Sequence, residues 1–381
     1  MPVTAAQIAQ QLVRLPSVNP AYDPGSSGEG RVVDWLEDWA RENQLEPVRQ
    51  PCLENRDNIS FTIRKGDGPH LLFNGHTDTV STEGMTIDPC GGEICEGRLW
   101  GRGSTDMKGP LAAMLSTLLQ MRERDDWRGS LTVGCVVDEE YKYRGIRSLL
   151  DANDPWDFAV VGEPTGLKVV RGCKGSCRFT IHTEGRAAHS SEPDNGANAI
   201  VGMARVIPAL AEFFETRLGD YAAAGFDPST GSIGLIEGGS GVNIVPDRCT
   251  ITIDLRTVPG QDERATLGEL EVFTRERCGD LGEVQLVFDE PTHFSPSFET
   301  STRHPLVRTA CEVVGDDKAR VVSFGCDGSK IAARGIPTIV LGPGDIGQAH
   351  TKDEFISLAD LEAGETTYLN LAFKLLQDHA D

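Results

Sequence analysis

The sequence reads Leu71-Leu72-Phe73-Asn74-Gly75-His76-Thr77-Asp78 at the point where an apolar run ends in polar residues. An apolar run of this length indicates a buried strand. His76 and Asp78 are two residues apart, so their side chains leave the strand end on the same side. Three more apolar runs end in potential metal ligands: 131–137 before Asp138-Glu139-Glu140, 158–161 before Glu163, and 337–341 before a Gly/Pro turn and His350. Because function gathers at the carboxyl ends of strands in open α/β sheets, we expect these groups to meet at one edge.

Helical spacing alternates with these strands through the first 170 residues, at 29–42, 107–121 and 144–150. The alternation predicts a mostly parallel sheet flanked by helices on both faces. The same α/β pattern resumes from about residue 291, with a helix at 305–314 and another after Leu358.

The intervening segment has a different pattern, because its strands alternate between apolar and polar residues as half-exposed strands do. Its predicted strands and helices, in chain order, are 177–183, helix 198–214, 232–236, 249–255, helix 262–276 and 283–288. This β-α-β-β-α-β order is that of a ferredoxin-like unit. We therefore expect an α/β catalytic domain over 1–174 and 292–381, with a ferredoxin-like α+β lid domain over 175–291 inserted into it.

The composition is that of an ordinary globular protein, with 39% hydrophobic and 25% charged residues in 381. The formal net charge of -22, from 36 basic and 58 acidic residues, argues against nucleic acid or an anionic membrane as partner. No stretch approaches 18 consecutive apolar residues, so no transmembrane helix is expected. The first 15 residues resemble an amphipathic helix rather than a signal peptide. The ten cysteines are scattered without a CxxC pair, so we expect free thiols and a cytoplasmic location.

Two imidazoles and several carboxylates at one sheet edge suit a pair of hydrolytic metal ions. Asp78 could itself be a ligand, or it could accept the second ring N–H of His76. Glu139 and Glu140 are adjacent and point different ways, so one can bind metal while the other acts as a general base. The residues alone leave open bland alternatives, since Asp106 could cap a helix, an acidic triplet could be solvated, and His350 could be an ordinary loop residue.

The turn Gly101-Arg102-Gly103-Ser104-Thr105-Asp106 precedes the helix expected near Met107. Its glycines would let the backbone approach another group closely, and we expect that group to be the metals. It is not a dinucleotide-binding fingerprint, because Asp106 stands in place of the third glycine.

Together these motifs resemble the acetylornithine deacetylase / succinyl-diaminopimelate desuccinylase family of dinuclear zinc amidohydrolases and peptidases. The resemblance spans most of the chain, and its motifs are Gly75-His76-Thr77-Asp78, Gly101-Arg102-Gly103-x-x-Asp106-Met107-Lys108-Gly109, Glu139-Glu140, Gly162-Glu163-Pro164 and Ala349-His350. It implies a zinc-dependent exopeptidase-like catalytic domain with an inserted lid through which the protein would form a homodimer. It also implies two Zn²⁺ ions, one held by His76 and Glu163 and the other by Glu140 and His350. Asp106 would bridge the ions, Asp78 would orient His76, and Glu139 would be the catalytic base.

The lid carries motifs that are similar to the family's substrate-binding segments. Within 185–191, the resemblance implies that His189 stabilises the oxyanion, often from the partner subunit. Asn243 and Arg256 are similar to residues that bind the substrate's carbonyl and α-carboxylate, and a planar guanidinium suits a carboxylate. The alternatives are that His189 is a loop histidine, Asn243 a turn residue, and Arg256 an outward-facing residue paired with Asp254.

The function hypothesis is hydrolysis of the amide of a small N-acyl-L-amino acid by a metal-bridged water, with Glu139 as general base. N-acetylornithine is the first candidate substrate, because the segments around Glu163 and His350 resemble the acetylornithine deacetylase branch. The resemblance would place the protein in arginine biosynthesis. Co²⁺ or Mn²⁺ could replace zinc on this ligand set. The alternatives are a dipeptidase or carboxypeptidase on the same centre and a non-catalytic binding homologue. Succinyl-diaminopimelate desuccinylation is disfavoured, because Ser329 and Lys330 stand near a position where such relatives often carry arginine.

Overall fold

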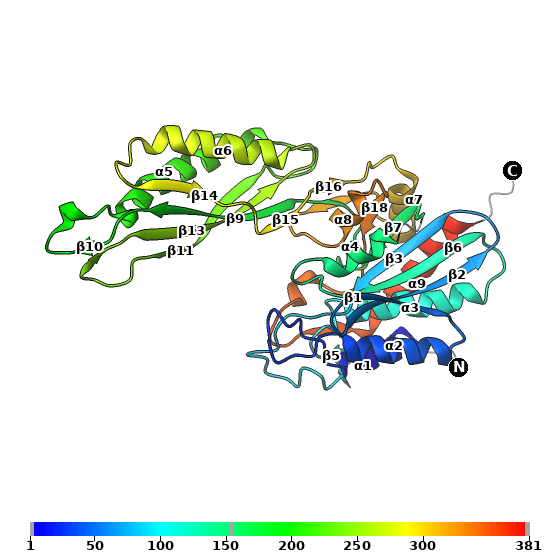
Figure 1. The fold of residues 1–381 in the computed structure, drawn as a ribbon. Coiled ribbons are helices and arrows are strands. Elements are labelled where there is room, and N and C mark those ends of the chain that lie inside the picture. The colour runs from blue at the N-terminus through cyan, green and yellow to red at the C-terminus, as the bar shows by residue number, and fades with distance from the viewer. Residues whose placement is uncertain (1–3, 153–154, 378–381) are drawn as a thin grey trace. The chain divides into compact units, whose positions relative to one another are not determined.

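A computed structural model describes residues 4–152 and 155–377 of the chain. Its contacts divide the chain into two compact units (Figure 1). The first comprises Met1–Gly172, Glu299–Arg320 and Cys326–Asp381, and the second comprises Cys173–Phe298 and Val321–Gly325. That the second unit serves as a lid and dimerisation domain stays a prediction.

The first unit contains most of a nine-stranded sheet whose centre is parallel, as predicted, while β17 lies largely in residues of the second unit. Its order is β1-β2-β6-β3-β7-β18-β8-β16, and β17 pairs with β8. The strands are β1 (Pro47–Leu53), β2 (Arg56–Lys65), β3 (His70–His76), β6 (Gly129–Val136), β7 (Phe158–Val161), β8 (Val170–Cys173), β16 (Phe298–Glu299), β17 (Arg320–Val322) and β18 (Thr338–Val340). Pairing is parallel from β6 through β3 and β7 to β18, and antiparallel at β1, β2 and β8.

Helices flank this sheet because its central strands are mostly apolar and must be covered on both faces. Every residue of β6 and all but the first of β3 are buried. The helices are α1 (Ala5–Val13), α2 (Gly30–Glu42), α3 (Lys108–Arg122), α4 (Arg144–Asp151), α7 (Pro305–Val314), α8 (Gly328–Ala332) and α9 (Leu358–Leu376). Helix α3 is buried on nearly all sides, which explains why its sequence is apolar rather than amphipathic.

A small second sheet in this unit joins segments that lie far apart in the sequence. It has the order β19-β5-β4, formed by β4 (Glu93–Cys95), β5 (Arg98–Trp100) and β19 (Phe355–Ser357). The 3₁₀ turn η3 (Ile346–Gln348) precedes β19. The sequence reasoning missed this sheet, because strands of three residues are too short to show a period.

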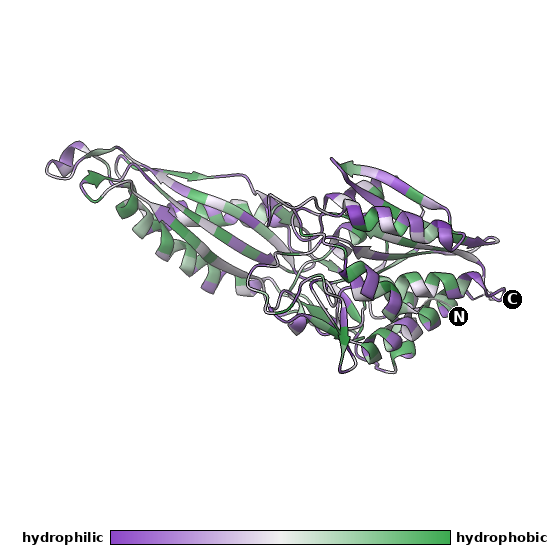
Figure 2. Ribbon diagram, turned by 90° about the horizontal axis from the view of Figure 1, so that it is seen from below, coloured by the Kyte–Doolittle hydropathy of each residue, from purple (hydrophilic) through white to green (hydrophobic). Residues whose placement is uncertain are grey.

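The second unit has the predicted β-α-β-β-α-β order, and its sheet order is β11-β13-β9-β14 with β15 paired to β9. The elements are β9 (Gly175–Glu184), α5 (Ala199–Thr216), β11 (Thr230–Gly238), β13 (Arg248–Thr257), α6 (Glu263–Cys278), β14 (Gln285–Phe288) and β15 (His293–Ser295). A two-stranded ribbon joins β10 (Ala188–His189) to β12 (Ile244–Val245), and two 3₁₀ turns are η1 (Pro193–Asn195) and η2 (Leu218–Asp220). Along β13 buried and partly exposed residues alternate, and Figure 2 shows polar and apolar residues interleaved in this sheet. One face therefore packs on α5 and α6.

Among the described residues, none of the helices combines the length and apolar character needed to cross a membrane.

Candidate metal centre

The predicted ligands converge because their strands are parallel neighbours. His76 ends β3, Glu139 and Glu140 follow β6, and Glu163 follows β7. His350 lies beyond β18, just after η3. Since β6, β3, β7 and β18 are successive parallel neighbours, their carboxyl ends share one edge of the sheet.

Asp106 lies between the two histidines. Its Oδ1 is 3.1 Å from Nε2 of His76, and its Oδ2 is 3.2 Å from Nε2 of His350. The same His350 nitrogen is 3.2 Å from Oε1 of Glu140. The loop before α3 therefore presents one carboxylate to two imidazoles, one on each of its oxygens.

A second group of donor atoms gathers around His76. The ligand atoms of His76, Glu139 and Glu163 all lie within 4.8 Å of one another, and so do those of His76, Asp106 and Glu140. Oε1 of Glu163 is 4.0 Å from Nε2 of His76. This Glu163 oxygen is buried and has no hydrogen-bond partner within the described ranges.

The carboxylates are buried close together, and this raises the pKa of most of them. Burial raises the pKa of Glu139 well above its usual value, and the charge of Glu163 adds to the effect. Burial and the charge of Asp106 likewise raise the pKa values of Glu163 and Glu140. Asp106 is the exception, because hydrogen bonds from His350 and His76 outweigh its burial and lower its pKa.

The pKa values of the two histidines are also raised, but by the neighbouring carboxylates and not by burial. Burial disfavours the charged form of His76, but Asp106 and Asp78 outweigh it, so that the His76 pKa lies well above its usual value. Hydrogen bonds to Asp106 and Glu140 raise the pKa of His350 to about 10, although half of its side chain is exposed.

These observations fit a pair of divalent cations. Carboxylate oxygens and imidazole nitrogens are the ligands of hydrolytic metal sites. Several buried acids at one place are costly unless positive charge offsets them. The unpartnered oxygen of Glu163 is a further donor that the protein itself leaves unused. Five residues could hold the ions, and they are His76, Asp106, Glu140, Glu163 and His350.

Asp78 connects His76 to the turn that carries Glu139 and Glu140. Its Oδ1 accepts the backbone N–H of Glu139 at 3.0 Å, and its Oδ2 accepts that of Glu140 at 3.2 Å. Nδ1 of His76 lies 3.0 Å from the main-chain carbonyl of Asp78 and 3.5 Å from its Oδ1. The carbonyl is therefore the nearer partner of the ring, and the carboxylate chiefly holds the Glu139-Glu140 backbone.

Asp138 differs from Glu139 and Glu140 because its buried carboxylate takes part in an ion network with arginines. Arg144 donates two hydrogen bonds to it, at 2.6 and 2.9 Å, and Arg56 a third at 3.2 Å. The Arg56 guanidinium also holds the buried carboxylate of Glu29. Asn19 donates its amide N–H to both Asp78 and Asp138, at 2.8 and 3.1 Å.

Sequence reasoning missed this network. Asn19, Glu29 and Arg56 lie in segments without a ligand pattern, and their role depends on partners 27 to 119 residues away. In the sequence Asp138 is simply one of three adjacent acidic residues, 138–140, which could be solvated. The structure shows that the Asp138 carboxylate instead accepts hydrogen bonds from Asn19, Arg56 and Arg144, next to the proposed ligands.

The glycines of the turn before Asp106 serve the protein's own packing, and this differs from the expectation. Gly103 has a φ of +83°, and a Cβ there would lie 2.9 Å from Cγ2 of Thr79. At Gly101 a Cβ would lie 2.4 Å from a methyl of Val13. The close approaches that need glycine are therefore to Thr79 and Val13.

The predicted substrate-binding residues lie in the second unit. His189 on β10 pairs with Ile244 on β12, and the backbone N–H of Ser190 donates to the carbonyl of Asn243 at 3.0 Å. His189 and Asn243 are therefore neighbours. Both are exposed, and Nδ1 of His189 bonds the hydroxyl of Ser191 at 2.6 Å.

Arg256 is not brought to His189 and Asn243 within this unit. These two lie beside the Arg248 end of β13, whereas Arg256 is eight residues further along the strand. At about 3.3 Å per residue, roughly 26 Å of strand separates the two ends. Nε of Arg256 is 2.7 Å from Oδ1 of Asp254, so the ion pair weighed as the alternative is present.

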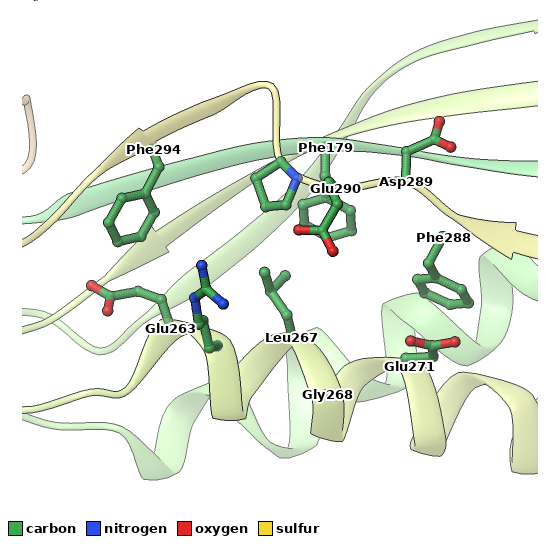
Figure 3. Close-up of a pocket in the computed structure, with 11 residues that line it drawn as sticks. Phe179, Glu263, Leu267, Gly268, Glu271, Phe288, Asp289, Glu290 and Phe294 are labelled. Carbon is green, nitrogen blue, oxygen red and sulfur yellow. The ribbon is translucent and has the colours of Figure 1, made fainter.

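A separate cavity of about 470 Å³ lies between α6 and the segment after β14 (Figure 3). Its floor includes Phe179 and Leu267, and acidic side chains such as Glu271 and Asp289 lie around it. Its lining has no histidine, cysteine, serine or threonine. Its only potential metal ligands are carboxylates, so it lacks the mixed imidazole and carboxylate set of the sheet edge.

Known proteins match this chain along most of its length. The sequence description of peptidase family M20/M25/M40 matches residues 72–374. Acetylornithine deacetylases of Erwinia tasmaniensis and Photorhabdus laumondii are 31% and 33% identical, over 93% of this chain and 93% and 92% of their own lengths. A tripeptidase from Staphylococcus aureus superposes with a TM-score of 0.78 at 21% identity, covering 98% of each chain.

These matches confirm the predicted resemblance, the fold class and the enzyme class. The relatives that are similar in sequence are named acetylornithine deacetylases, as the predicted branch is, and the solved structure has the same fold. The chain belongs to peptidase family M20/M25/M40 and is a metal-dependent hydrolase of amide bonds.

Proposed function

We propose that the protein removes the acyl group of a small N-acyl-L-amino acid, with N-acetyl-L-ornithine as the first substrate to test. The arrangement of Asp106 between two imidazoles carries the hydrolytic part of this proposal. The substrate rests on the acetylornithine deacetylases that are 31% and 33% identical to the chain. A peptidase acting on dipeptides is the second candidate, since the same centre could attack a peptide bond.

In this proposal His76 and Glu163 would hold one zinc ion, Glu140 and His350 would hold the other, and Asp106 would be a ligand shared by both. Bound divalent cations would acidify water and polarise the amide carbonyl. Cobalt or manganese would suit the same donors. Asp78 keeps the Glu139-Glu140 turn and His76 in fixed relation through the contacts described above.

Glu139 is the proposed general base. It accepts a proton from the attacking water and returns the proton to the leaving nitrogen, because an amide nitrogen leaves poorly as an anion. Burial and the charge of Glu163 raise the pKa of Glu139, and a carboxylate with a raised pKa is a stronger base. We assign oxyanion stabilisation to His189, carbonyl binding to Asn243 and carboxylate binding to Arg256.

The proposed homodimer is supported by the positions of these three residues. Two residues of extended chain span about 7 Å, so a small N-acyl amino acid cannot bridge roughly 26 Å of strand. If His189, Asn243 and Arg256 all contact one substrate, they must come from two subunits. A cytoplasmic location is supported by the ten cysteines, all of which are free thiols.

The exposed edge of the second unit's sheet also supports the dimer. Strand β11 forms one edge of the sheet, and its Leu235 and Ile236 are 64% and 57% exposed. Val201 on α5 is a further large apolar residue that is exposed in this unit. An unpaired apolar edge strand is a template for pairing with another chain.

The substrate proposal is tested by amine release from N-acetyl-L-ornithine, from other N-acyl amino acids and from dipeptides. We expect release from N-acetyl-L-ornithine by zinc-loaded protein and none after the metal is stripped, with recovery when zinc is added back. Metal-dependent cleavage of dipeptides alone would contradict deacylation and favour the peptidase. No release from any of these substrates, with two zinc ions bound, would contradict both.

Replacing Glu139 by glutamine should separate catalysis from metal binding. We expect Glu139→Gln to retain two metal ions and to lose activity by about 10²–10⁴-fold, the usual contribution of a general base. Glu140→Gln is the matched control one residue along, and it should lose metal. Metal content is measured by atomic emission, and loss of metal from Glu139→Gln would reassign this residue as a ligand.

Metal affinity should rise with pH. A ligating imidazole must be neutral, and in metal-stripped protein Asp106 and Glu140 hold a proton on His350 up to a pKa of about 10. Glu139, Glu140 and Glu163 also have raised pKa values, so their deprotonation acts in the same direction. We therefore expect affinity to increase as the pH rises, until His350 is deprotonated near pH 10.

The stability of the stripped protein should change in the opposite sense. His350 gains its partners in the folded state, so its contribution to stability is complete below about pH 6.5 and is lost as the pH rises towards 10. Chelator competition measures the affinity, and thermal unfolding of stripped protein measures the stability. An affinity that is constant over this range would show that no proton leaves when metal binds.

The dimer is tested at the β11 edge. We expect Ile236→Lys to convert a dimer into a monomer, because a charge on an edge strand opposes pairing. Val272→Lys is a matched control, since Val272 on α6 is also 57% exposed and lies outside β11. Light scattering after gel filtration gives the mass. A monomeric unmodified protein, or an Ile236→Lys variant that stays dimeric, would contradict pairing through this edge.

A further inference from the structure

The carboxylate of Glu354 receives four donors at the metal centre and is fully buried. Its Oε1 accepts the backbone N–H groups of Thr105 and Asp106, at 2.9 and 3.0 Å. Its Oε2 accepts the N–H of Gly103 at 3.1 Å and Nη1 of Arg102 at 2.7 Å. Four of five consecutive residues in the turn that ends at Asp106 thus donate to one side chain.

Glu354 also belongs to the segment that carries His350. It lies four residues after His350 and directly before β19. Strand β19 pairs with β5, which directly precedes the turn, and the Glu354 carbonyl accepts the N–H of Gly101 at 3.0 Å. The hydroxyl of Thr105 donates to the carbonyl of Phe355 at 2.6 Å. The chain from β5 through the turn to Asp106 is therefore joined along its length to the chain from Glu354 through β19, and the Glu354 carboxylate lies at the Asp106 end.

We propose that Glu354 is a positioning residue of the metal centre, which fixes the turn presenting Asp106 against the segment presenting His350. This inference rests on the proposed metal site and adds a residue to its support. Asp106 has to place one oxygen towards each histidine, and a rotation of its backbone would move both oxygens at once. Three N–H groups held by one carboxylate restrict that rotation, and one of them belongs to Asp106 itself.

The pattern of donors makes Glu354→Gln an informative substitution. Each carboxylate oxygen accepts from two donors, so either orientation of a glutamine amide places its NH₂ group against two N–H donors. The shape of the side chain is retained while two buried donors lose their acceptor, which is costly. Asp353→Asn is the matched control, because Asp353 is the adjacent exposed residue and bonds only the Thr86 side chain among the described side chains.

We expect Glu354→Gln to weaken zinc binding about 10–100-fold, as substitutions of groups that orient ligands commonly do. KM should change little while kcat at limiting zinc falls, and excess zinc should restore much of it. Asp353→Asn should behave as the unmodified protein. Should Glu354→Gln fail to fold, Glu354→Asp keeps the charge but withdraws it by one methylene, and it should shift zinc affinity in the same direction by less.

Amide hydrogen exchange in metal-stripped protein provides a readout that requires no metal. Exchange at Gly103, Thr105 and Asp106 should accelerate in Glu354→Gln and stay unchanged in Asp353→Asn. Unchanged zinc affinity in Glu354→Gln, or a lower melting temperature with unchanged exchange at these three amides, would overturn the positioning role. Failure of the unmodified protein to bind zinc would instead overturn the proposed function, and the exchange data would still decide whether Glu354 fixes the turn.

Discussion

Asp106 is the residue on which the metal centre depends, because its two oxygens face two different histidines. One oxygen is within hydrogen-bond distance of His76, which comes from the end of a buried central strand. The other oxygen faces His350, which lies in a loop and whose side chain is half exposed. A single carboxylate thus contacts one buried and one half-exposed histidine, and any displacement of its backbone would affect both contacts.

The strands explain why the centre forms where it does. β3, β6, β7 and β18 are parallel neighbours, so a polar residue just beyond the end of each arrives at the same edge. Because these strands are buried on both sheet faces they are largely apolar, which is why the change to His76, Glu139 or Glu163 is visible in the sequence. The arrangement that creates the site therefore also made its principal residues recognisable.

What the sequence could not reveal were the residues that act through distant partners. The strand at Phe158–Val161 and the helix at Pro305–Val314 were predicted to the residue, because periodicity and a proline at the helix start are local signals. Asn19 reaches Asp78 across 59 positions, and Glu354 reaches Asp106 across 248. Strand β1 was missed because its polar residues and two prolines hide any strand period.

Two kinds of buried carboxylate meet at this edge, and their surroundings distinguish support from chemistry. Asp78, Asp138 and Glu354 each receive several N–H donors from the protein, which offset part of the cost of burying their charge. Glu163 has a buried oxygen without a donor, and burial beside Glu163 raises the pKa of Glu139. An uncompensated buried charge costs stability. The protein supplies donors to the first set and leaves the Glu163 oxygen without one, so Glu163 and Glu139 are the carboxylates that fit the proposed cation binding and proton transfer.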